Sequence, residues 1–271
     1  MSGFLSSSTA LRICKTDSAA SLDLDALRQH AFIPDIDADG RRFGWVGLGD
    51  PLDTDGFELA SVDARFMGFS FRLDTRKASG TVIRLQLAEA VREEIASGKK
   101  MDGKRKKELK EAITAKRIAR AEFVPSLIDC LWDAEKGRLL VASASAKTVQ
   151  PVLDLFKTSF GIDAAPTAPT GDMPKLYAMG STSLAASEQA DEKSAVAQAL
   201  DKGMMLQKLH LEATSANEPD WQVDFTLDAT LAVSRLRLPK AKKGAGKDAT
   251  FLVNADICSR VADMIAALAS E

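Results

Sequence analysis

The sequence predicts an α+β fold, in which antiparallel sheets pack against helices and one basic helical hairpin. The first observation is that strand-like and helix-like periodicities come in unequal blocks rather than in a regular β-α-β succession. The second is a helical segment near the middle of the chain that is dense in lysine and arginine. A chain of 271 residues, 45% of them hydrophobic, can form one large domain or two modest ones. We expect a single chain over residues 1–271, with possible sub-lobes at 1–78, 79–160 and 161–271.

The first part of the chain is predicted to hold one short helix and several strands. Residues 21–31 open with a serine and an acidic first turn, which is typical of a helix start. A turn is expected at residues 39–40, before the apolar stretch 43–46. The alternating stretch 57–73 indicates a strand pair that turns near residues 63–65.

Two helices follow. Residues 81–97 carry apolar residues at i, i+4 spacing, and Gly98 ends that helix. The ladder consists of Ile83, Leu87, Val91 and Ile95. A second helix is expected from about residue 104 to 121. Because the connection between them is short and contains glycine, we predict an αα-hairpin.

The segment after the hairpin predicts a strand pair and a helix. Residues 128–133 and 138–144 read as strands joined by a turn, and 146–160 as a helix with one apolar stripe. Residues 161–180 contain Pro166, Pro169 and Pro174 and indicate a linker or long loop. A helix is expected at 192–200.

The C-terminal part is predicted to be mostly strands closed by a helix. The strands are expected at 209–213, 221–228, 231–238 and 251–253, and the helix at 255–269. The apolar alternation changes phase within the third of these strands, which indicates a turn or bulge near Ser234.

Several classes of enzyme and of binding site are disfavoured. The sequence has no GxxxxGK[ST] loop, no GxGxxG after a strand and no GxSxG, so ATP, NAD and α/β-hydrolase chemistry are not expected. His30 and His210 lie outside any metal-ligand pattern, and we expect both to be surface or half-buried side chains. We expect no cofactor and no metal.

The cysteines and the hydropathy of the sequence indicate the cellular compartment in which we expect the protein. Cys14, Cys130 and Cys258 are widely spaced and lie in apolar segments, so we expect small buried side chains and a reducing cytoplasm. No stretch approaches the length of a membrane span, and the first ten residues lack the pattern of a signal peptide.

The charge distribution is the most informative feature. The net charge is −2, but residues 99–120 hold ten Lys and Arg against three Asp and Glu, which makes this segment +7 and the remaining chain −9. Cations at this density repel one another, and a polyanion relieves the repulsion because each neutralised phosphate releases a counterion. We predict DNA-backbone contacts from Lys99, Lys100, Lys104, Arg105, Lys106, Lys107, Lys110, Lys116, Arg117 and Arg120.

The composition of this segment favours binding that does not read the base sequence. Lysines outnumber arginines seven to three, and the segment has no aromatic residue to stack on bases. On the second helix Lys106, Lys110 and Arg117 can share a face. A second, weaker basic run contains two glycines that also fit a flexible loop, and it adds Arg235, Arg237, Lys240, Lys242 and Lys243 to the predicted contacts.

Other interpretations of these charges remain open. The basic helix could be a solvated surface helix, or it could dock on an acidic partner protein. Asp220, Asp224 and Asp228 recur on the polar face of one predicted strand, with Glu212 on the strand before, and could hold Mg²⁺ in a metal-dependent nuclease. They could equally form a solvated acidic face, and no lysine follows any of them at the distance that such nucleases use.

Short patterns along nearly the whole chain follow the order of those in one known protein family. The first are Phe32-Ile33-Pro34 and Gly44-Trp45-Val46, followed by a Lys-rich break at 103–110. The most recognisable stretch is the run Leu131-Trp132-Asp133, Gly137-Arg138-Leu139-Leu140-Val141 and Ala144-Ser145-Ala146-Lys147. Further patterns lie at Lys208-Leu209, Trp221-Gln222, Arg235-Leu236 and Asp248-Ala249. In these patterns and their order, the chain resembles the RdgC family of recombination-associated proteins.

This resemblance implies an α+β, RdgC-like curved subunit that pairs two-fold into a ring around DNA. It implies a nucleoid-associated, non-catalytic homodimer that binds single- and double-stranded DNA and limits RecA-type filaments during recombination. Where family members tend to carry an aromatic residue that helps to close the ring, this chain has Glu122, with Phe123 one place later. A loop that is basic in other members contains Glu188 and Glu192 here.

Overall fold

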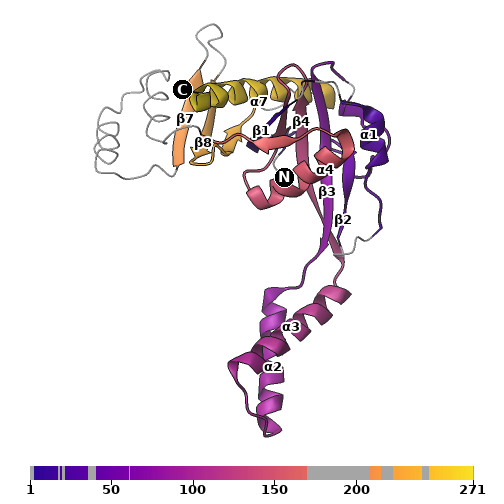
Figure 1. The fold of residues 1–271 in the computed structure, drawn as a ribbon, viewed down its shortest axis with the longest axis vertical. Helices are drawn as coiled ribbons and strands as arrows, with labels where there is room; N and C mark the ends of the chain where they lie inside the picture. Colours follow the sequence, from indigo (N-terminus) through magenta and orange to yellow (C-terminus); the bar gives the residue numbers. More distant parts are fainter. Residues whose placement is uncertain are drawn as a thin grey trace, which may run out of the picture. The chain divides into compact units, whose positions relative to one another are not determined.

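A computed structural model describes residues 3–17, 19, 22–35, 41–60, 62–169, 208–214, 222–239 and 244–270. It has the predicted α+β class (Figure 1). The strands are β1 (Ser8–Thr16), β2 (Arg42–Gly47), β3 (Phe66–Arg76), β4 (Phe123–Asp133), β5 (Arg138–Val141), β6 (Ala164–Pro166), β7 (Lys208–Thr214), β8 (Gln222–Asp228) and β9 (Val233–Arg237). The helices are α1 (Leu24–Gln29), α2 (Gly80–Ala96), α3 (Gly103–Arg120), α4 (Ala146–Phe160) and α7 (Lys247–Ser270), with a 3₁₀ turn at Glu58–Ala60.

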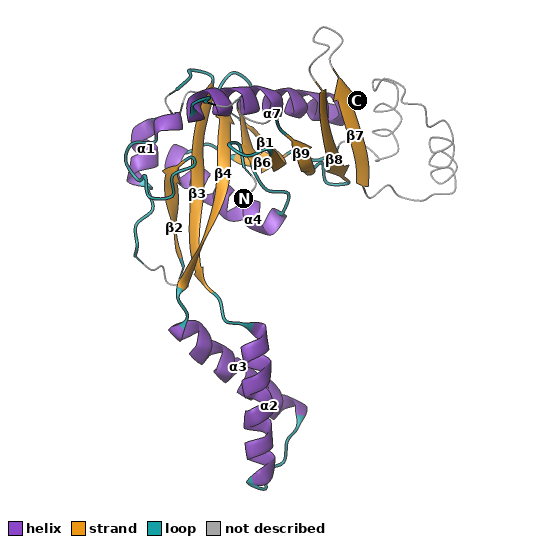
Figure 2. Cartoon of the chain, turned by 180° about the vertical axis from the view of Figure 1, so that it is seen from behind, coloured by secondary structure: helices purple, strands orange, loops and turns teal. Residues whose placement is uncertain are grey.

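The strands form one nine-stranded sheet in the order β2-β3-β4-β5-β1-β9-β8-β7, with β6 pairing beside β1 (Figure 2). The pairs β4·β5, β5·β1, β1·β9, β9·β8 and β8·β7 are antiparallel. The chain divides into two compact units, and three of the four divisions fall within β2, β3 and β4. The first unit comprises Met1–Ala31, Gly44–Phe71 and Ile128–Glu271, and the second comprises Phe32–Phe43 and Arg72–Leu127.

In the first unit, α7 and α4 cover opposite faces of the sheet. Successive residues of a strand point to opposite faces. In β4, Leu131 belongs to the core cluster that α7 supplies, whereas the ring of Trp132 lies 5.7 Å from that of Phe156 on α4. Trp45 and Phe69 pack edge to face at 5.1 Å. Aromatic side chains therefore dominate the α4 side, and aliphatic side chains dominate the α7 side.

Several predicted elements are confirmed. Helix α4 has the predicted ends, because Gly161 adopts a left-handed conformation (φ 68°) that suits a residue without a side chain and stops the helix. The bulge is also present: Arg235 has φ 57°, and the register between β1 and β9 shifts there. All three cysteines are buried, His30 is half-buried at the end of α1, and His210 is exposed on β7.

Other predictions were wrong. Residues 57–73 do not form a strand pair: a 3₁₀ turn precedes a single strand, and Asp63 caps the entry to β3 by accepting hydrogen bonds from the backbone N–H of Arg65 and Phe66. Residues 251–253 are helical, because Phe251 is the first of the apolar residues that α7 buries at helical spacing.

Some element boundaries also differ from the prediction. Helix α1 begins at Leu24 with Asp23 as its cap, β4 begins five residues before the predicted start, and β5 ends three residues before the predicted end. Strand β6 lies within the predicted linker. The turn at 39–40, the linker from residue 170 onward, the helix at 192–200 and the Glu188–Glu192 region lie outside the described residues. Among the described helices, none is long and apolar enough to cross a bilayer.

Candidate nucleic-acid interface

Helices α2 and α3 form the predicted hairpin in the second unit (Figure 1). Gly98, with φ 76°, ends α2, and the N–H groups of Gly98 and Lys99 donate to the carbonyls of Ile95 and Glu94 in the pattern of a Schellman motif. The carboxylate of Asp102 then caps α3 by accepting from the backbone N–H of Arg105 at 2.7 Å. Neither helix contains a fully buried residue, so the hairpin has a thin apolar interior.

Two arginines of α3 connect it to α2. Arg105 donates from Nε to Oε2 of Glu94 at 3.0 Å and from Nη2 to Oε1 at 2.6 Å. Arg117 donates from Nε to Oε1 of Gln86 at 2.8 Å. The hydrogen bonds that Arg105 donates hold the pKa of Glu94 below its usual range, and donating to Glu94 and Glu108 raises the pKa of Arg105. These two arginines, which the sequence placed among the DNA contacts, are thus also structural.

The other cations of the hairpin are exposed and mostly unpaired. Lys99 lies 3.5 Å from Glu94, and Lys107 lies 3.9 Å from Glu111. Apart from Arg117, six predicted cations of the hairpin have no ion pair within the described part of the chain: Lys100, Lys104, Lys106, Lys110, Lys116 and Arg120. The segment 80–120 holds twelve Lys and Arg against six Asp and Glu, so a positive excess remains after the internal pairs are formed.

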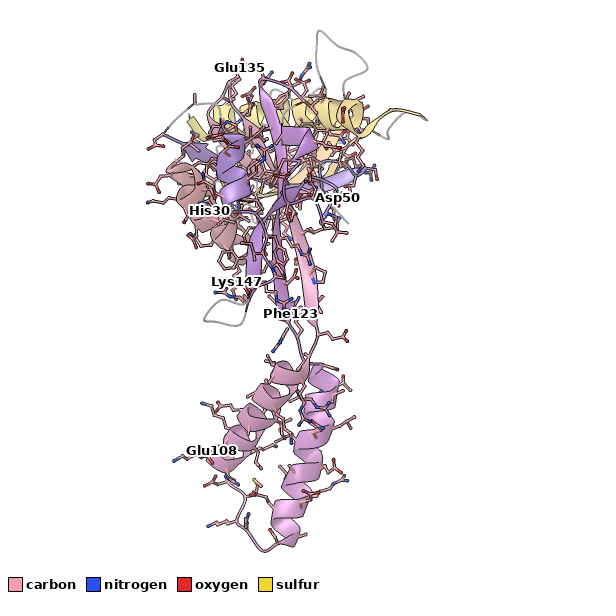
Figure 3. The ribbon with its side chains drawn as sticks, turned by 90° about the vertical axis from the view of Figure 1, so that its right-hand side faces the viewer. His30, Asp50, Glu108, Phe123, Glu135 and Lys147 are labelled. Carbon is pink, nitrogen blue, oxygen red and sulfur yellow. The ribbon has the colours of Figure 1, made fainter. Side chains whose placement is uncertain are left out.

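The cations of α3 are not spread evenly around the helix. At 100° per residue, Lys106, Lys110 and Arg117 fall within about 40° of one another and span about 16 Å along the helix axis. Beside them, Lys107 and Lys110 border a shallow hollow of about 420 Å³ whose floor contains Ala115 and Ile118. Figure 3 shows Glu108 on the same helix. The arrangement is a line of positive charge that a phosphate backbone can follow.

The second predicted basic run lies in the first unit. Arg235 and Arg237 are on β9, and Nη1 of Arg237 lies 3.3 Å from Oδ2 of Asp224. Lys240, Lys242 and Lys243 lie outside the described residues. Of this run, the structure thus places only two arginines, and one of them is paired with a carboxylate.

The acidic strand face is arranged differently from a shared metal site. Asp224 lies opposite Glu212 on β7, but Asp228 is four residues away along β8, about 13 Å. Asp228 accepts hydrogen bonds from Thr230 and Ala232 in the β8–β9 turn, and these bonds outweigh burial and lower its pKa. Asp220 is outside the described residues, and among those described no group of three or more His, Cys, Asp or Glu could hold a metal.

Sequence reasoning missed a second cationic cluster, at the strand ends next to the hairpin. The Cζ atom of Arg42 lies 3.7 Å, and that of Arg76 4.5 Å, from the centre of the Phe123 ring. All three residues belong to the second unit, and Figure 3 shows Phe123 at this position. The pairs Arg41-Arg42 and Arg76-Lys77 were the available signal, but only the sheet brings them near one aromatic side chain.

The sequence was compared with models of protein families and with curated proteins. A family model described as "RdgC: Putative exonuclease, RdgC" matches residues 9–179, a range that includes the whole hairpin. A search of curated proteins finds no match.

Proposed function

The chain belongs to the RdgC family of recombination-associated proteins, and on that premise we propose that it binds DNA through the exposed cations of α3 without reading the base sequence. One observation carries the proposal. Lys104, Lys106, Lys110 and Lys116 are exposed and have no carboxylate partner among the described residues, although six acidic side chains occur in the same hairpin. Unpaired cations repel one another on a hairpin that buries little apolar surface, and a phosphate backbone would relieve that repulsion.

The kinds of side chain support contact with the backbone rather than with bases. Lysine offers a point charge on a flexible stem, which suits phosphates at variable positions. The hairpin has no aromatic residue on which a base could stack. Two of its arginines, Arg105 and Arg117, are engaged with Glu94 and Gln86 and are therefore less available for a planar, two-pronged contact with guanine. Binding of this kind is expected on both single and double strands.

Salt-dependent binding tests the proposal. Affinity for a duplex of arbitrary sequence is measured at several salt concentrations for the wild type and for a variant carrying Lys104→Gln, Lys106→Gln, Lys110→Gln and Lys116→Gln. Each lost phosphate contact should lower the slope of log K against log salt by about 0.9, and the loss should be the same for unrelated sequences. The matched control replaces four cations of the first unit, Arg28, Lys136, Lys147 and Lys157, by Gln. An unchanged slope in the α3 variant would refute DNA binding by this helix.

The effect on recombination is the second part of the proposal. A protein that occupies DNA without sequence preference competes with RecA-type filaments for the same strand. Strand exchange by a RecA-type recombinase should therefore be inhibited by the wild type and not by the α3 variant. Equal inhibition by both would mean that the effect does not pass through these cations.

We further propose that the protein acts as a ring-like homodimer, as its family resemblance implies. A closed ring gains residence time on DNA by topology, so each phosphate contact can stay weak. Light scattering should give twice the mass of one chain, and circular DNA should retain the protein at salt concentrations that release it from linear DNA of the same length. A monomer, or equal release from both substrates, would argue against the ring.

We propose that binding proceeds without cleavage of the DNA, although the matching family model is described as an exonuclease. The separation of Asp224 from Asp228 and the use of Asp228 in a turn support this view. Incubation with labelled DNA and Mg²⁺ or Mn²⁺ should leave the DNA intact. Degradation that Asp224→Ala abolishes would establish a nuclease instead.

A further inference from the structure

The ring of Phe123 holds two arginines that no carboxylate of the described residues neutralises. Arg42 begins β2, Arg76 ends β3 and Phe123 begins β4, and these three strands are neighbours in the sheet. Both guanidinium carbons lie within 4.5 Å of the ring centre. A guanidinium over an aromatic face is attracted by the ring quadrupole and is held in a defined position.

Neither arginine has a carboxylate partner in the described part of the chain. The Nε atoms of both Arg42 and Arg76 are buried and lack a hydrogen-bond acceptor. Arg76 uses Nη1 to donate to the carbonyl of Ala119 at 3.2 Å, in the last turn of α3. No hydrogen bond of Arg42 to the protein is present among the described residues. Because both guanidinium groups are partly buried against the same ring, salt screens their mutual repulsion only in part.

A structural role accounts for only part of this arrangement. The bond from Arg76 to Ala119 complements the negative end of the α3 dipole, which explains one arginine. It does not explain why Arg42 stacks on the same ring, since its charge adds repulsion and its side chain satisfies no carbonyl or carboxylate among the residues that the structure describes. Pairing of arginine with an anion is normally the arrangement that stabilises such a half-buried guanidinium.

We propose that Arg42 and Arg76, positioned by Phe123, clamp one phosphodiester group of DNA at the strand ends next to the hairpin. The inference rests on the proposed DNA binding and adds to it a contact made by planar guanidinium groups rather than by lysines. Arg42 has both Nη groups to offer and Arg76 has Nη2, which are donors enough for the two non-bridging oxygens of a phosphodiester. Arg120 lies three residues before Phe123 and adds a further exposed cation without an ion pair in the described region.

Variants at Arg42 give the sharpest test, because its side chain makes no hydrogen bond to the described residues that the substitution would remove. Duplex affinity and its salt slope are measured for the wild type, Arg42→Gln and Arg42→Lys. Arg28→Gln is the control, since Arg28 is a partly exposed arginine paired with Asp25 at 2.8 Å in the first unit. Arg42→Gln should lower the slope by about 0.9 and weaken binding about eightfold at 0.1 M salt. Arg42→Lys should keep the slope, and Arg28→Gln should change neither quantity.

The Phe123→Leu variant tests the positioning of the two guanidinium groups without changing their charge. Both arginines remain, so the slope should stay at its wild-type value, but the guanidinium groups lose their support, and affinity should fall about two- to fivefold. The helicity of each variant, measured by circular dichroism, checks that the fold is retained. If Arg76→Gln unfolds the end of α3, the Arg42 series still decides the question.

The outcomes distinguish the clamp from the function on which it rests. A wild-type affinity and slope for Arg42→Gln, together with a reduced slope for the α3 lysine variant, would overturn the clamp and leave the proposed function standing. A wild type that retains no DNA at low salt would overturn both. Stabilisation of the wild type by inorganic phosphate, without loss of DNA affinity in Arg42→Gln, would identify a small-anion site and overturn the clamp on DNA.

Discussion

The guanidinium of Arg105 and the carboxylate of Glu94 form a doubly hydrogen-bonded pair that joins the start of α3 to the last turn of α2. The Glu94 side chain is only 14% exposed, which makes it the most sheltered carboxylate in the ion pairs of the hairpin. Because neither helix has a fully buried residue, this pair substitutes for part of the missing apolar interior.

Loss of either partner should loosen the hairpin. Arg105→Gln and Glu94→Gln should each speed amide hydrogen exchange in residues 80–120, and the double variant should be little worse than either single one, because both changes remove the same contact. Lys100→Gln, an exposed change in the same hairpin without a lost ion pair, is the control and should leave exchange unchanged. Additive effects of the two single changes would show that the pair is not coupled.

The same pair should make the hairpin sensitive to acid. Since the folded-state pKa of Glu94 is lowered, mainly by the hydrogen bond from Arg105, the contribution of the pair is complete above the unfolded value of 4.5. It is lost as the pH falls below 4.5 through the lowered folded value. Exchange in residues 80–120, corrected for the intrinsic pH dependence, should therefore increase over this range in the wild type. Glu94→Gln should lack the increase.

Asp133 should be among the costliest charges to remove in the first unit. It is fully buried and accepts hydrogen bonds from Ser259 at 2.6 Å and from Arg138 and Arg65 at 3.3 Å. Burial alone would raise its pKa, but these partners outweigh burial and lower it. Asp133→Asn removes the buried carboxylate that Arg138 and Arg65 share and leaves Arg138 with only the half-exposed Asp263 as a charge partner. The change should lower the free energy of unfolding by about 3–5 kcal/mol in urea titrations.

A matched variant, Asp263→Asn, tests whether the burial of Asp133 is the reason for the large expected loss of stability. Asp263 pairs with the same arginine at 2.8 Å but is 48% exposed. Asp263→Asn should therefore cost about 1 kcal/mol or less. Equal losses for Asp133→Asn and Asp263→Asn would contradict this explanation.

The protonation of Asp129 should make the free energy of unfolding depend on pH with the sign opposite to that expected for Glu94. Burial raises its pKa, and hydrogen bonds from the Ser70 hydroxyl and the Phe4 N–H offset this only in part. Between the unfolded value of 3.8 and the raised folded value, the native state binds more protons, so the free energy of unfolding falls as the pH rises. Asp129→Asn should remove this component, which urea titrations at several pH values between 4 and 7 would measure. If the pH profile of Asp129→Asn ran parallel to that of the wild type, Asp129 would not be the source of this pH dependence.

Gly68 should be intolerant of a side chain. A Cβ there would lie 2.6 Å from Cε2 of Phe251 and 2.8 Å from Cδ2 of Leu48, so the first turn of α7 packs directly on the β3 backbone. Gly68→Ala should lower the free energy of unfolding by about 1–3 kcal/mol, because the core must move to accept the methyl group. Gly246→Ala, where a Cβ meets nothing within 4 Å, should be close to neutral.

The sequence by itself determined the elements whose signals are local. The hairpin and α4 follow from apolar spacing within each helix and from Gly98 and Gly161, which adopt left-handed conformations at the helix ends. The bulge near Ser234 follows from a change of phase within one strand. Residues 251–253 were misassigned because three apolar residues fit either period, and only the packing of Phe251 in the core shows that α7 includes them.

The tertiary structure alone decided which cations are free and which are already bound. Lys110 and Arg117 look alike in the sequence, but Arg117 lies within hydrogen-bonding distance of Gln86 on the neighbouring helix, and Lys110 has no such partner in the described chain. The approach of Arg42 and Arg76 to Phe123 likewise depends on the order of β2, β3 and β4 in the sheet. Which groups a charged side chain contacts depends on distances in space. Because the contacting residues are often far away in the sequence, a local sequence pattern does not identify these partners.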